Sequence, residues 1–233
     1  KAHIIMEQIR GHHKLKTRPK QDVFSLEDIE KFIPALPEYM RLMIEINLFT
    51  GARPGEIRNL KWAQADFEDC RINLEWNDVK EGYDKSLKLP DRLMIELQAL
   101  WKTTSKNDDN VPDCPHVFQG PRHNGKVISE TQYYIAWHET CRHLGFVKMD
   151  SKKGKQVSKY TPHSLRRTMV TLNLKAGFDP KQIMTQTGHR TFRVFEQYNI
   201  VGKEAQEDMV LKQDEEWARL KNKETEKKDD YQK

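Results

Sequence analysis

The sequence lacks long hydrophobic runs. None approaches the roughly 20 consecutive apolar residues of a membrane-spanning helix, and the mean hydropathy is −0.86. No secretory signal is visible either. These absences argue against membrane and secreted proteins and predict a polar protein of the cytoplasm that has no membrane partner.

The sequence also has few cysteines and no phosphate-binding glycine motif. The three cysteines are odd in number and widely spaced, which argues against a disulfide framework and for a reducing compartment. There is no Walker-type glycine-rich loop, so we expect no nucleotide cofactor. His138 and Cys141 share a helical face, but His143 does not and no second ligand pair has zinc-like spacing. We therefore expect no metal.

The charge is unevenly spread. The net charge is +5, yet residues 203–233 carry 8 basic and 10 acidic side chains, leaving 32 basic and 25 acidic side chains before them. A basic body suits a polyanion such as DNA. The 233 residues allow one large or two small domains. Because the chain starts with Lys1 rather than Met, we expect a fragment.

Periodicity and capping residues predict a mainly α-helical fold with a small antiparallel β-sheet, of the α+β class. Helices are expected at residues 25–32, 39–49, 54–60, 93–101 and 130–144, and strands at residues 71–76 and 85–89. We expect residues 1–24 to be a basic linker or arm and residues 25–202 to be the main domain. Residues 203–233 should form a helical tail with one narrow apolar stripe, because Ala205, Met209, Trp217 and Leu220 recur close to helical spacing.

The stretch 161–199 contains histidines, arginines and a tyrosine at spacings that would bring their side chains together. Pro162 fits the first turn of a helix after Thr161 as N-cap, which places His163 and Arg166 side by side on one face. This helix should end at Gly177.

A second helix should follow directly in the same stretch. Asp179 and the next proline open it, and it should end at Gly188, so that His189 lies just past its last turn. Tyr198 follows nine residues later.

These residues resemble the tyrosine recombinase (phage integrase) family. His163-Ser-Leu-Arg166 is similar to the family's H-x-x-R box, Gly188-His189 to its L-G-H box, and Tyr198 stands where the family has its nucleophile. A lone H-x-x-R would be weak evidence, since it occurs by chance in many helices.

The first arginine box of the family, T-G-x-R-x-x-E, resembles residues 50–57, which contain Arg53 and Glu56. The resemblance spans residues 25–199 and implies that residues 25–202 are the catalytic domain. It implies a site-specific DNA recombinase that cuts and rejoins strands through a covalent 3′-phosphotyrosyl link. The family's usual N-terminal helical domain is expected to be absent from this chain.

The resemblance assigns roles that fit the chemistry of a phenol nucleophile. With a pKa of about 10, only about one phenol in a thousand is ionised at neutral pH, so Tyr198 needs concentrated positive charge around its target. Arg53 and Arg166 would clamp the phosphate, and His189 would add a third donor. His163 would take the tyrosine proton and return it on the reverse step.

A lysine of the sheet's hairpin supplies the leaving-group proton in the family. Lys80 is favoured here because it lies at the start of the turn, and Lys85 is the alternative. Glu56 would hold a guanidinium in place without itself contacting the phosphate.

Further basic residues are candidates for contacts with DNA phosphates. Residues 148–159 should form a mobile loop or hairpin near the phosphates, with a merely solvated loop as the alternative. The candidates are Lys148, Lys152, Lys153, Lys155, Lys159 and, beside the H-x-x-R arginine, Arg167.

The expected partners are double-stranded DNA and further copies of the chain. The tail would join them in a homo-oligomer, a tetramer on paired sites, or else dock on its own subunit. A type IB topoisomerase and a DNA-binding accessory protein that no longer cleaves are the alternative functions.

Overall fold

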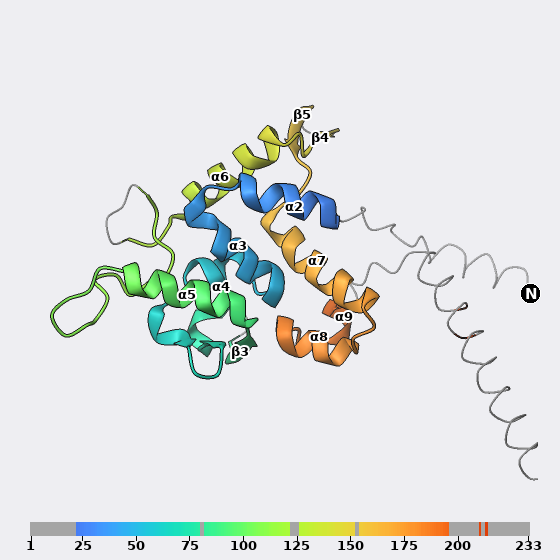
Figure 1. The fold of residues 1–233 in the computed structure, drawn as a ribbon. Helices are drawn as coiled ribbons and strands as arrows, with labels where there is room; N and C mark the ends of the chain where they lie inside the picture. Colours follow the sequence, from blue (N-terminus) through green and yellow to red (C-terminus); the bar gives the residue numbers. More distant parts are fainter. Residues whose placement is uncertain are drawn as a thin grey trace, which may run out of the picture.

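The computed structural model describes residues 22–79, 82–121, 126–151 and 154–195, together with Val210 and Gln213. Within these residues helices predominate and the strands form small antiparallel sheets, so the predicted fold class is confirmed (Figure 1). None of the helices in these ranges has the length and apolar character that crossing a membrane requires.

Three helices open the described chain. They are α2 (Leu26–Ala35), α3 (Glu38–Thr50) and α4 (Pro54–Arg58). Ser25 caps α2 by accepting the backbone N–H of Asp28, as predicted. Gly51 ends α3 with φ of 62°, a left-handed conformation that favours glycine. The chain then turns sharply, and Pro54 begins α4.

A three-stranded sheet follows in the order β1-β2-β3. Its strands are β1 (Ala65–Asp66), β2 (Arg71–Leu74) and β3 (Lys85–Lys88), with the short 3-10 helices η1 (Trp62–Gln64) and η2 (Trp76–Asp78) beside them. Asn73 pairs with Ser86, so the predicted antiparallel hairpin is confirmed. In β3 the side chains of Lys85 and Leu87 are buried while their neighbours are exposed. A lysine therefore faces the interior.

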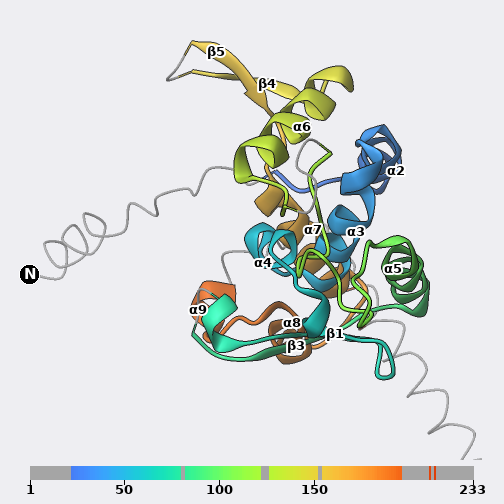
Figure 2. The same ribbon diagram turned by 90° about the vertical axis from the view of Figure 1, so that its left-hand side faces the viewer.

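The second half of the chain is again helical. It contains α5 (Asp91–Thr103), α6 (Glu130–His143), the hairpin of β4 (Val147–Asp150) and β5 (Lys155–Ser158), α7 (Pro162–Lys175), α8 (Pro180–Thr187) and α9 (Phe192–Phe195). The hairpin projects from the body beside α6 (Figure 2). Gly188 ends α8 with φ of 72°, as the sequence predicts.

Two hydrophobic cores hold these elements. The larger core joins α2, α3, α5, α6 and the three-stranded sheet, with Phe32 and Trp137 among its buried rings. A smaller core joins α7, α8 and α9 and consists of Met169, Val170, Ile183 and Phe195. Helix α7 also packs along α3, and α8 packs against β3. The end of α3, the start of α7 and the end of α8 therefore meet.

Candidate active site

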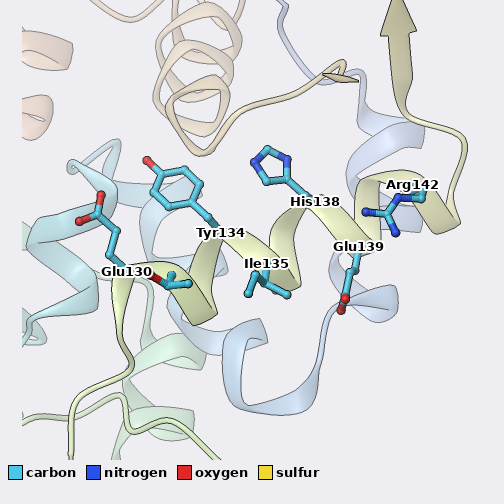
Figure 3. Close-up of a pocket in the computed structure, with 7 residues that line it drawn as sticks. Glu130, Tyr134, Ile135, His138, Glu139 and Arg142 are labelled. Carbon is cyan, nitrogen blue, oxygen red and sulfur yellow. The ribbon is translucent and has the colours of Figure 1, made fainter. Parts of the chain in front are cut away.

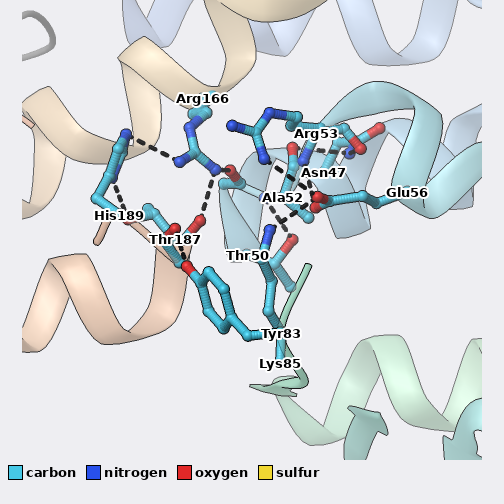
Figure 4. A network of polar contacts seen from close by, with 12 residues as sticks. Asn47, Thr50, Ala52, Arg53, Glu56, Tyr83, Lys85, Arg166, Thr187 and His189 are labelled. Carbon is cyan, nitrogen blue, oxygen red and sulfur yellow. Dashed lines mark hydrogen bonds and ion pairs between the residues drawn. The ribbon is translucent and has the colours of Figure 1, made fainter. Parts of the chain in front are cut away.

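Arg166 lies at the centre of this meeting point (Figure 4). Its side chain projects from α7 and is almost fully buried. Nη1 donates to the carbonyl oxygens of Gly51 and Thr187, each at 2.6 Å, and Nη2 lies 2.8 Å from Nε2 of His189. The guanidinium thus joins the end of α3 to the end of α8.

The contacts of His189 determine which ring nitrogen carries its proton. An arginine can only donate, so Nε2 accepts from Arg166 and the proton lies on Nδ1. Nδ1 is 2.6 Å from Oγ1 of Thr187, whose hydroxyl donates in turn to the carbonyl of Ile183. Burial, followed by the nearby cations, lowers the pKa of His189 to about 3. His189 is therefore neutral at physiological pH.

Arg53 stands at the N-cap of α4, and Glu56 in the next turn holds it. Glu56 accepts the backbone N–H of Arg53 at 2.9 Å and lies 3.4 Å from its Nη1. The side chain of Arg53 is 30% exposed, whereas that of Glu56 is 4% exposed. Figure 4 shows the guanidinium of Arg53 beside that of Arg166. Of the two arginines expected to bind the phosphate, Arg53 is thus partly open to solvent and Arg166 is buried.

Lys85 reaches this cluster from β3. Its Nζ lies 2.7 Å from Oε1 of Glu56, and its side chain is 2% exposed. Burial lowers the pKa of Lys85, although Glu56 opposes the shift. A Cβ atom added at Gly188 would lie 2.6 Å from Cε of Lys85, so the lysine stem runs against the turn before His189.

His163 occupies the first turn of α7, three residues before Arg166, as predicted. Burial, followed by the charges of Arg167, Arg166 and Arg53, lowers its pKa to about 4. The structure therefore brings together His163, Arg53, Arg166, Glu56 and His189, with Lys85 among them. His163 is therefore a neutral imidazole at physiological pH.

Two contacts beside the cluster were not anticipated from the sequence. The hydroxyl of Tyr83, in the turn before β3, donates to the carbonyl oxygen of Gly188. The guanidinium of Arg190 lies 5.2 Å from the centre of the Tyr83 ring. These side chains, with Lys85 and His189, line a hollow of about 540 Å³.

Four candidate positions lie outside the described residues. They are Lys80, Lys152, Lys153 and Tyr198. The predicted helical tail falls outside the described part of the chain as well, apart from two isolated helical residues.

Two of the described basic residues in and beside the hairpin already contact carboxylates. Lys148 pairs with Asp22, and Nζ of Lys159 lies 3.4 Å from Asp28. Lys155 is exposed on β5.

A different hollow, of about 740 Å³, lies on the outer face of α6 (Figure 3). It is lined by Tyr134, Ile135, His138 and neighbouring side chains. His138 contacts Oγ of Ser158 at 2.7 Å, and Cys141 is buried. In the described ranges no three His, Cys, Asp or Glu side chains group as metal ligands.

Comparison with known proteins identifies the family. Residues 22–204 match the profile of the phage integrase family, so the chain belongs to that family. A comparison with curated protein sequences gave no significant match.

Several solved structures share the fold. The XerA recombinase has 22% identity and a TM-score of 0.61, over 84% of this chain and 67% of that one. The Tn1549 transposon integrase with transposon right end DNA has 17% identity and a TM-score of 0.59, over 84% and 67%. A lambda integrase dimer on a COC′ core site has 18% identity and a TM-score of 0.59, over 84% and 53%. With its family, this chain is a site-specific DNA recombinase of the tyrosine class.

Proposed function

We propose that residues 25–202 are the catalytic domain of a recombinase that cuts and rejoins DNA through a covalent 3′-phosphotyrosyl intermediate. The carrying observation is the convergence of Arg53 and Arg166 with two neutral imidazoles, from segments far apart in the sequence. Phosphoryl transfer develops charge on the equatorial phosphate oxygens, and guanidinium groups are well suited to bind them.

Arg53 and Arg166 would bind the scissile phosphate from two sides. Arg53 can turn toward an incoming phosphate because it is partly exposed, whereas the Gly51 and Thr187 carbonyls fix Arg166. His189, held beside Arg166, would join them as a donor once a bound phosphate replaces Nε2 as the acceptor for Arg166 and Nε2 is protonated. The phosphate itself favours that protonation, because a nearby anion raises the pKa of an imidazole.

Tyr198 would be the nucleophile and His163 its base. The phenol oxygen attacks phosphorus, its proton passes to His163, and the bond from phosphorus to the 5′ oxygen breaks. Tyr198 follows the buried Phe195 by three residues, and three residues of chain span at most about 11 Å. The ring of Phe195 lies 5.6 Å from that of His189, so Phe195 itself lies beside the cluster.

Lys80 would give a proton to the leaving 5′ oxygen, with Lys85 as the alternative donor. Glu56 would hold Arg53 in place through its two oxygens. The phosphotyrosyl link conserves the energy of the broken phosphodiester, so rejoining needs no nucleotide. Reversal of the same proton transfers restores the tyrosine.

Double-stranded DNA is the proposed substrate. Neighbouring structures such as the Tn1549 integrase are complexes with DNA. The proposed phosphate contacts are Arg167 and the lysines Lys148, Lys152, Lys153, Lys155 and Lys159. Lys148 and Lys159, whose side chains are exposed, would have to exchange Asp22 and Asp28 for phosphate. Ion pairs formed by exposed lysines contribute little, so the exchange is accessible.

Residues 203–233 would link copies of the chain, giving a homo-oligomer, a tetramer on paired sites. Deleting them should leave single-site cleavage measurable and weaken assembly and strand exchange. Normal recombination by the truncated chain would rule out this role for the tail.

A test of this function does not require a defined DNA target. A pool of labelled duplexes with a nick beside randomised sequence is incubated with the protein, and DNA bound covalently is captured after denaturation and sequenced. A covalent adduct excludes a DNA-binding accessory protein. Strand exchange between two copies of the recovered duplex excludes a topoisomerase that only relaxes DNA. Failure to trap any adduct would contradict the proposed function.

A further inference from the structure

Tyr83 occupies a fixed place in the turn between β2 and β3. Gly82 precedes it with φ of 67°, and the carboxylate of Asp84 accepts the backbone N–H of Trp76 at 2.8 Å. This bond closes the base of the turn immediately beside Tyr83. The half-buried ring therefore projects from a part of the hairpin that is itself anchored.

The hydroxyl of Tyr83 contacts the residue that precedes His189. It donates to the carbonyl oxygen of Gly188, and Arg190 lies against the face of the ring. Burial raises the pKa of Tyr83, and the neighbouring arginines only partly oppose this shift. The hydroxyl therefore stays protonated and remains a donor at neutral pH.

The turn at Gly188 is held from a second direction by Lys85. A Cβ atom at Gly188 would lie 2.6 Å from Cε of the lysine, and the left-handed φ already favours glycine. The hairpin thus holds the Gly188–His189 peptide unit on one side by the hydrogen bond from Tyr83 and on the other by the aliphatic part of Lys85. That peptide unit leads directly into His189, which contacts Arg166.

We propose that Tyr83 is a positioning residue that holds the Gly188–His189 turn and thereby keeps the imidazole of His189 against Arg166. Its effect on DNA cleavage rests on the proposed function, whereas its effect on the imidazole does not. Without the bond to Gly188, the turn can rotate and His189 samples orientations away from Arg166.

The test variant is Tyr83→Phe, which removes one oxygen and retains the ring. Cleavage of the duplex recovered by adduct capture should slow about two- to tenfold, the usual range for loss of one hydrogen bond. The matched control is Tyr134→Phe on α6, which should cleave at the wild-type rate. Thermal unfolding of both variants shows whether a slower rate merely reflects a less stable fold.

Two further measurements identify the group through which Tyr83 acts. In a His189→Ala background, Tyr83→Phe should cause no additional loss, because the two changes remove the same contribution. A substrate whose bridging 5′ oxygen is replaced by sulfur should not restore the Tyr83→Phe rate, because the defect concerns phosphate binding. Additive losses, or full restoration by sulfur, would overturn the proposal.

Nitrogen-15 NMR of the His189 ring provides a readout without DNA. In the wild type the ring should show one fixed tautomer with the proton on Nδ1, and in Tyr83→Phe the two nitrogen signals should broaden or move together. An unchanged imidazole spectrum in Tyr83→Phe would refute the proposal even if the wild type cleaves no DNA. Absence of any wild-type adduct would instead refute the proposed function.

Discussion

Arg166 and His189 contact each other through Nη2 and Nε2 at 2.8 Å, a cation facing a neutral imidazole. The contact is possible because two backbone carbonyls, those of Gly51 and Thr187, already solvate the guanidinium. These neutral acceptors bind Nη1 of the almost fully buried guanidinium without cancelling its charge. The positive charge therefore still attracts an anionic ligand.

Replacing Arg166 with Lys should reduce cleavage by at least about a hundredfold, because a single ammonium cannot reproduce a planar fork that binds two carbonyls and an imidazole. Single-turnover cleavage of the nicked duplex measures the change. Arg142→Lys on the exposed surface of α6 serves as the control. Cleavage by Arg166→Lys within threefold of wild type would show that the fork is dispensable.

The stability of the fold should fall in mild acid. The folded-state pKa values of His163 and His189 are lowered to about 4 and about 3, whereas an unfolded histidine titrates near 6.5. Below pH 6.5 the unfolded chain therefore binds protons that the folded chain excludes. The free energy of unfolding should drop by up to about 1.4 kcal/mol per pH unit for each histidine, down to about pH 4.

Urea unfolding at pH 7, 6 and 5 measures this dependence. His163→Gln should give a shallower slope, and the exposed His143→Gln should retain the wild-type slope. Identical slopes for all three proteins would contradict the low pKa of His163.

The two hairpin lysines can be distinguished with the bridging-sulfur substrate, since a thiolate leaves without needing a proton. The proposed role of Lys80 predicts that this substrate restores cleavage by Lys80→Ala but not by Arg53→Ala. Restoration of Lys85→Ala instead would assign proton donation to the buried lysine that contacts Glu56.

Glycine should be required at position 188 for two separate reasons. Gly188 and Gly145 both have left-handed backbones, with φ of 72° and 71°, so alanine at either position should cost about 1 kcal/mol in conformational strain. Only at Gly188 would the new methyl group meet Lys85, whereas at Gly145 it would enter open space. Gly188→Ala should therefore be a further 1–3 kcal/mol or so less stable. Equal losses in urea unfolding would contradict the close contact.

Local patterns in the sequence predicted much of this arrangement. The glycines at positions 51 and 188 mark helix ends, and Pro162 with the spacing of His163 and Arg166 places two site candidates on one helical face. These features depend only on neighbouring residues, so they can be recognised without a structure. Strand β1 and helix α9 are too short to produce a detectable period.

The remaining contacts arise from packing between distant segments. Arg166 binds the carbonyls of Gly51 and Thr187 because α3, α7 and α8 meet, and backbone acceptors carry no sequence pattern. The alternation of β3 places Lys85 on the side of Leu87, but only the fold supplies the carboxylate of Glu56 that allows a lysine to be buried there. The Tyr83 bond to a backbone carbonyl is likewise invisible in the sequence.

Tyr198 provides the most direct test of the proposed mechanism. Wild-type protein and Tyr198→Phe are incubated with the captured nicked duplex, and covalent protein–DNA complexes are counted after denaturation. Mass spectrometry then locates the linked residue. The proposal predicts a DNA-linked Tyr198 peptide in the wild type and no adduct in Tyr198→Phe, with DNA binding retained because only one oxygen and no positive charge is lost. An adduct that persists in Tyr198→Phe, or one linked to another residue, would contradict it.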